Sequence, residues 1–72
     1  MSEQQVADRV VGTSIRKLFP KYGYFKGVVS SFDEEEGLYF VSYEDGDEEE
    51  LTLKELAPYL PKEISRLLRA RV

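Results

Sequence analysis

The stretch Leu38–Asp47, LYFVSYEDGD, is the part of the sequence that best indicates the fold. Its side chains form two alternating rows, with Tyr39, Val41 and Tyr43 in one and Leu38, Phe40 and Ser42 in the other. Neither row is polar throughout, so both faces of a strand over 38–44 should be at least partly covered, as in a central strand of a small barrel. The Asp45-Gly46 pair predicts a hairpin, because Asp-Gly suits a tight turn between antiparallel strands.

Further strand patterns lie on both sides of this stretch, over 13–19, 24–32 and 48–53. Short turns at 20–23 and 33–37 connect them, so we expect an antiparallel meander. Gly27 lies inside the second strand, which predicts a bulge, a bend or a close neighbour there. Four short strands would curl to cover their edges, and a short fifth strand or an extended piece around Tyr59-Leu60 would close the sheet.

The two ends of the chain differ from this middle part. Residues 1–9 form a leader in which Ser2–Gln5 fits a capping box, so residues 4–11 form either a helical turn or a frayed end. Residues 54–57 predict one helical turn before Pro58. After the barrel region 10–60, residues 61–72 predict a basic helix that begins at a proline and has one apolar stripe, Ile64, Leu67, Leu68 and Val72. The expected fold is therefore mainly β: a small, strongly bent antiparallel barrel of about five strands with a short C-terminal helix.

Composition argues against several kinds of chemistry. The 72 residues include no cysteine and no histidine, which excludes disulfides, the usual zinc sites and Ser-His or Cys-His catalytic pairs. An EF-hand loop from Asp33 would need glycine at the position of Leu38. The mean hydropathy is −0.42, and we expect no membrane segment and no secretory signal. We therefore expect a binding module, not an enzyme, with no cofactor and no metal.

Charge is distributed unevenly around a net value of −4. Residues 33–50 contain ten acids and no base, whereas residues 1–32 and 51–72 are both net basic. One interpretation is a solvated, solubilising surface. The other is an acidic surface that attracts a basic partner. Nucleic acid is a weaker partner hypothesis, because the acidic middle repels phosphate and only the flanks would attract it.

Nine aromatic residues are the most informative side chains. A small domain without tryptophan needs several of them in its core. Four others lie at strand ends that a meander brings together, and we call them the aromatic rim: Phe19, Tyr24, Phe25 and Tyr43. Ring faces beside carboxylates attract methylammonium groups. The rim therefore predicts a site for a methylated cation beside carboxylates.

Several segments together resemble a Tudor-like domain of the type found in plant and other eukaryotic chromatin proteins. The resemblance covers about residues 10–60, and its most specific part is Tyr43–Asp47 followed by acids and a leucine. The other segments are Val11-Gly12, Ile15–Phe19, Phe25–Val29, Gly37–Ser42, Glu49–Leu51 and Leu56.

The resemblance implies a bent barrel and a chromatin reader that binds methylated lysine or arginine on histone tails. In members that bind methyl-lysine, the cage positions correspond here to Phe19, Phe25, Tyr43 and a residue near Glu49. The resemblance thus implies a three-walled cage with an acidic fourth position at Glu49, to which Asp45 or Asp47 lends charge. We therefore expect a nuclear protein, longer than this chain, that binds a basic peptide such as a histone tail. The alternative is a structural or scaffold module that packs against other domains. Exposed, converging rings would favour the reader, and buried rings would favour the scaffold.

Overall fold

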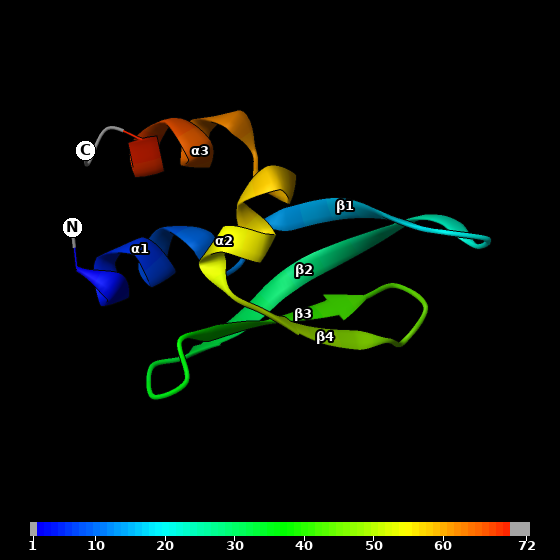
Figure 1. Ribbon diagram of the computed structural model, residues 1–72, viewed down its shortest axis with the longest axis horizontal. Coiled ribbons are helices and arrows are strands. Elements are labelled where there is room, and N and C mark those ends of the chain that lie inside the picture. The colour runs from blue at the N-terminus through cyan, green and yellow to red at the C-terminus, as the bar shows by residue number, and fades with distance from the viewer. Residues whose placement is uncertain (1, 70–72) are drawn as a thin grey trace.

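The computed structural model describes residues 2–69, which form one sheet with its helices gathered at one end (Figure 1). Four strands are joined as an antiparallel meander in the order β1-β2-β3-β4. They are β1 (Ser14–Phe19), β2 (Gly23–Asp33), β3 (Leu38–Tyr43) and β4 (Glu48–Leu51). The strands expected over 13–19, 24–32 and 38–44 thus exist, and the fourth ends two residues earlier than predicted. Both neighbours of β3 are strands, which confirms its central position.

Tight turns connect the strands as the sequence predicts. At the β3–β4 hairpin, Gly46 has a φ of +93°, and its N–H donates to the carbonyl of Tyr43. Only glycine adopts this left-handed conformation without strain, so the Asp-Gly prediction is confirmed here. The N–H of Asp47 donates to Asp45 Oδ1 at 3.1 Å, which fixes the turn further. This hairpin lies at the end of the sheet opposite the helices (Figure 1).

A bulge in β2 determines which side chains face the core. The β2–β3 register shifts between Val29 and Ser31, so that β2 contains one residue more than β3 at this point. Before the bulge Phe25, Gly27 and Val29 share a face, and after it Phe32 returns to that same face. The irregularity predicted at Gly27 therefore lies three residues further on, whereas the close neighbour predicted for Gly27 does exist, as described below.

Helix α1 (Glu3–Val10) closes one end of the core. The Ser2 and Gln5 side chains form the predicted capping box, so the helical interpretation of the leader is confirmed. Val6, Ala7 and Val10 are at most 2% exposed and pack with Val29 and other inward residues of the sheet. The leader is therefore part of the hydrophobic core.

The segment after β4 consists of three short helical elements, with extended backbone at Leu60 between the second and the third. It comprises α2 (Leu53–Leu56), the 3₁₀ turn η1 (Ala57–Tyr59) and α3 (Lys62–Arg69). The prediction of a fifth strand at Tyr59-Leu60 is wrong. Pro58 has no N–H to donate to a strand ladder, and it instead occupies the first turn of η1.

The predicted C-terminal helix is present as α3, next to α1 at the helical end of the molecule (Figure 1). Ile64 and Leu68 pack against the core, and Leu67 is half-buried. Val72, the last residue of the predicted stripe, lies outside the described residues. Within residues 2–69, no helix has the length and apolar character needed to cross a membrane.

Candidate functional site

Three aromatic rings meet at the inner face of the sheet, from β1, β2 and β3. Phe19 ends β1, Phe25 lies near the start of β2, and Tyr43 ends β3. The Phe19 ring is edge-on to Phe25, with centroids 5.8 Å apart, and edge-on to Tyr43, with centroids 5.0 Å apart. Edge-to-face pairs at such distances are favourable. We call these three residues the ring cluster.

Gly27 allows the Tyr43 ring to take its place in the cluster. Gly27 lies directly opposite Tyr43 in the β2–β3 ladder. A Cβ atom on Gly27 would lie 2.8 Å from Tyr43 Cδ1 and 3.0 Å from Val41 Cγ1. Real Cβ atoms essentially never lie so close to another heavy atom, and the rigid tyrosine ring cannot bend away as a flexible side chain can. Gly27 has no left-handed φ, so its backbone conformation does not require glycine. Glycine is required here because any side chain would collide with the Tyr43 ring.

The three rings are covered to different degrees. Tyr43 is only 5% exposed and belongs to the core, whereas Phe19 and Phe25 are half-buried at its edge. The convergence of the rings favours the reader hypothesis, whereas the burial of Tyr43 favours the scaffold hypothesis. An incoming group would meet Phe19 and Phe25 first, and Tyr43 mainly through its hydroxyl.

Glu49 on β4 joins this hydroxyl to a lysine on β1. Tyr43 Oη donates to Glu49 Oε2 at 2.7 Å, and Lys17 Nζ donates to Glu49 Oε1 at 2.7 Å. Burial alone would raise the pKa of the Glu49 carboxyl, but the two hydrogen bonds and the charge of Lys17 together hold that pKa below its ordinary value. Burial and the bond to Glu49 raise the pKa of Tyr43. At neutral pH the site therefore contains a carboxylate, a neutral phenol and an ammonium.

Lys17 and Tyr59 are site residues that the sequence-based prediction missed. The Lys17 ammonium lies 5.6 Å from the centroid of the Phe19 ring and 5.5 Å from that of Tyr59, within the usual range of a cation–π contact. Side chains alternate between the two faces of a strand, so Lys17 shares the inner face of β1 with Ile15 and Phe19. This alternation could have predicted the position of Lys17. Tyr59 lies on η1, where no periodicity places its ring.

The remaining predicted site residues lie elsewhere. Tyr24 alternates with Phe25, so its ring is on the outer face, 60% exposed and 5.0 Å from the Arg16 guanidinium carbon. Asp45 and Asp47 are exposed in the β3–β4 turn, where Asp45 accepts a hydrogen bond within the turn itself. The structure therefore brings together Phe19, Phe25, Tyr43 and Glu49, and separates them from Tyr24.

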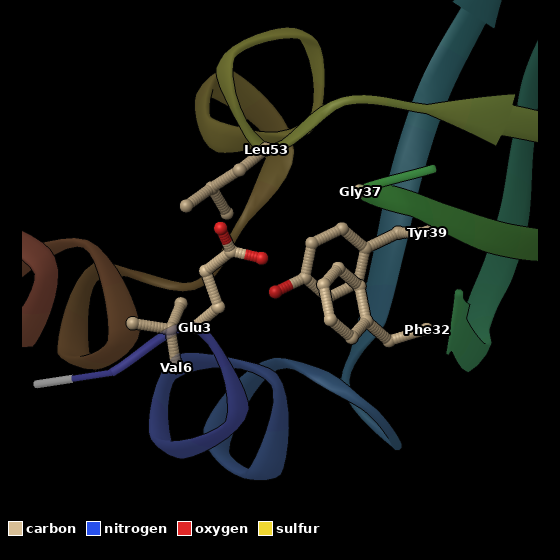
Figure 2. Close-up of a pocket in the computed structure, with 6 residues that line it drawn as sticks. All are labelled: Glu3, Val6, Phe32, Gly37, Tyr39 and Leu53. Atoms are coloured by element: carbon tan, nitrogen blue, oxygen red, sulfur yellow. The ribbon is translucent and has the colours of Figure 1, made fainter. Parts of the chain in front are cut away.

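A cavity of about 230 Å³ lies at the other end of the core, next to α1 (Figure 2). Glu3 and Val6 of α1 face Phe32, Tyr39 and Leu53 across it. This cavity also combines aromatic rings with a carboxylate. However, Tyr39 is only 2% exposed, and Phe32 packs against it with centroids 4.6 Å apart, so the tyrosine offers no open ring face. The cavity is better suited to an apolar group than to a cation held between rings.

Carboxylates are also common ligands of metal ions. Across residues 2–69, no three acidic side chains are placed to hold a metal ion together. The acids of 33–36 and 44–50 lie largely along exposed turns and β4. Their contribution to any ligand is therefore electrostatic attraction at the surface.

Comparisons with known proteins agree with this architecture. Residues 12–60 match the sequence profile of the PTM/DIR17-like Tudor domain family. Over 49 residues the chain is 45% identical to Dirigent protein 17 of Arabidopsis thaliana, a match that covers 68% of this chain and 18% of that protein. The chain thus spans less than a fifth of the length of this relative.

A solved structure is also similar. It is the Tudor domain of Arabidopsis RDM15, determined in complex with an H3K4me1 peptide. The two share 42% sequence identity with a TM-score of 0.54, and the match covers 64% of this chain and 81% of the RDM15 domain. Helices α1 and α3 both lie outside the part of the chain that the family profile matches.

Proposed function

The chain belongs to the PTM/DIR17-like Tudor domain family, and we propose that it binds a basic peptide, such as a histone tail with a methylated lysine or arginine, at the ring cluster. The observation that carries this proposal is the convergence of Phe19, Phe25 and Tyr43 beside the Glu49 carboxylate. Aromatic faces attract a methylammonium group, while a carboxylate compensates its charge. A binding role of this kind implies a nuclear, non-enzymatic domain of a longer chromatin protein.

The surroundings of the cluster support a basic ligand. Glu48 and Glu50 flank Glu49 in the sequence and are exposed on the opposite face of β4, and the acidic β3–β4 turn follows Tyr43 directly. These charges would draw a basic peptide toward the rings and speed its association. The similar RDM15 domain was solved with a histone H3 peptide, which supports the same class of partner here.

The test is a chemical-shift titration of residues 1–72 with histone-tail peptides in unmodified, monomethyl and trimethyl forms. We expect a preference for a methylated form, with the largest shifts at Phe19, Phe25 and Tyr43. Affinity should fall as salt rises, because exposed charges are screened over about 8–10 Å near physiological ionic strength. Equal binding of modified and unmodified peptides would contradict the cage, and shifts centred on Phe32 and Tyr39 would move the site to the cavity next to α1.

The second candidate is a scaffold module, and the observation that favours it is the burial of Tyr43 at 5% exposure. In this case the rings are the end of the core, and partner domains pack against the outer surface. Absence of any peptide-dependent shift, with a stably folded domain, would support this function over the first.

A further inference from the structure

A cation from the chain itself, the ammonium of Lys17, already lies beside the ring cluster. This ammonium lies between the Phe19 and Tyr59 rings and donates to Glu49 at 2.7 Å. The side chains of Lys17 and Glu49 are 18% and 31% exposed, so the pair is partly shielded from water. Two rings and a carboxylate around an ammonium are the groups that would bind a ligand's lysine.

We propose that Phe19, Tyr59 and Glu49 form a cation-binding position that Lys17 fills as an internal competitor, and that a ligand's alkylammonium group enters it by displacing Lys17. This inference rests on the proposed function. It adds Tyr59 as a further wall of the site and identifies Lys17 as the residue that regulates ligand binding there. Without displacement, the Lys17 charge would repel an incoming cation and neutralise the carboxylate that should attract it. The affinity measured for a ligand is then reduced by the fraction of molecules in which Lys17 occupies the position.

The surroundings of Lys17 make this exchange feasible. Lys17 is on β1, an edge strand of the sheet, and Tyr59 is on the short turn η1 that faces it. A lysine side chain has four flexible carbon–carbon bonds and can swing into solvent without a change in the backbone. Tyr43 continues to donate to Glu49 after Lys17 leaves, so the carboxylate stays aimed at the vacated position.

Occupancy by Lys17 can be measured without any ligand. Protons on the Lys17 Cε carbon should resonate upfield of those of Lys26 and Lys21, because they lie beside two aromatic rings. Glu49→Gln should shift them toward the values of these exposed lysines. Lys17 signals that already coincide with Lys21 and Lys26 in the unaltered protein would overturn the proposal, whatever the outcome of peptide binding.

Competition is tested by titration with N-acetyl-trimethyllysine amide. We compare Lys17→Gln with Lys26→Gln, which changes the net charge equally but alters an exposed residue on β2. We expect Lys17→Gln to bind more tightly, by on the order of three- to ten-fold, and Lys26→Gln to bind as the unaltered protein does. Melting curves show whether each variant is folded at the titration temperature.

The outcomes separate this proposal from the one on which it rests. Equal or weaker binding by folded Lys17→Gln would overturn the competition while leaving the reader function intact. If no variant binds the probe, the reader function fails, and the displacement of Lys17 by a ligand fails with it. The Lys17 proton shifts still report whether the position holds a cation. Tyr59→Leu should weaken binding of the probe in the Lys17→Gln background, and unchanged binding would remove Tyr59 from the site.

Discussion

The two ends of the core contain similar groups in different arrangements. At the ring-cluster end, Tyr43 donates to Glu49, which also holds Lys17. At the helical end, Tyr39 and Phe32 pack together next to Glu3, and α1 covers them. The helical end is closed by apolar side chains that are fully buried, whereas the ring-cluster end carries the partly exposed ion pair of Lys17 and Glu49. A tyrosine next to a glutamate therefore has a structural role at one end and can serve binding at the other.

The largest difference should appear when one side chain is shortened at each end. Leu56 on α2 is completely buried at the helical end, so Leu56→Ala should lower the free energy of unfolding by about 2–5 kcal/mol. Phe25→Leu at the half-buried ring cluster should cost less than about 1.5 kcal/mol, since it retains apolar bulk. Urea denaturation followed by circular dichroism measures both. Equal losses would show that the ring cluster is as much a part of the core as the helical end.

Removal of residues 62–72 tests how far α3 contributes to the closed end. Ile64 and Leu68 pack against the core, and their partial burial should be worth about 1.5–3 kcal/mol together. The melting temperature should fall, and trimethyl-lysine binding at the other end should persist in the fraction that remains folded. In the full chain, Ile64→Ser with Leu68→Ser should reproduce the loss, and Lys62→Ser with Arg66→Ser should not. An unchanged melting temperature after deletion would mean that α3 serves a partner.

Much of this architecture was predictable from local sequence. Alternation over 38–43, the Asp45-Gly46 turn and the Ser2 capping box each act through neighbouring residues, and each is present in the structure. The missing fifth strand shows the limit of this approach, because Tyr59-Leu60 resembles a strand only when the effect of Pro58 on the following turn is ignored.

The candidate site was less predictable because it depends on contacts between distant residues. Phe19, Phe25 and Tyr43 could be grouped by their positions at strand ends. Lys17 is 32 residues from Glu49, and their hydrogen bond joins β1 to β4, two strands that are not neighbours in the sheet. No local pattern specifies a contact of this kind, so the internal cation became visible only in the structure.

Ligand binding at the ring cluster should respond to the loss of a single ring. Tyr43→Leu retains apolar bulk but removes the π face and the hydroxyl that orients Glu49. The domain should stay folded and lose about 0.5–2 kcal/mol of methylammonium binding, the usual worth of one such contact. Tyr22→Leu is the matched control, because Tyr22 lies in the β1–β2 turn and is 77% exposed. If Tyr43→Leu binds a trimethyl-lysine peptide as well as the unaltered protein does, the scaffold function takes first place.

The smallest expected effect is the pH dependence of the Glu49 interactions. Folding lowers the pKa of Glu49 below its ordinary value near 4.5, so these interactions stabilise the fold above that pH and are lost as the pH falls through the folded-state pKa. The unaltered protein should exceed Glu49→Gln in stability at pH 7 by less than about 1 kcal/mol, because the carboxylate is partly exposed to screening solvent. The two should converge as the pH is lowered past 4.5. Urea midpoints at a series of pH values measure this convergence, with Glu48→Gln on the exposed face of β4 as the control that should stay parallel to the unaltered protein. Parallel curves for Glu49→Gln and the unaltered protein would mean that Lys17 and Tyr43 do not stabilise the carboxylate relative to its hydration in the unfolded chain. The ring-cluster end would then lack the charged interactions that distinguish it from the helical end.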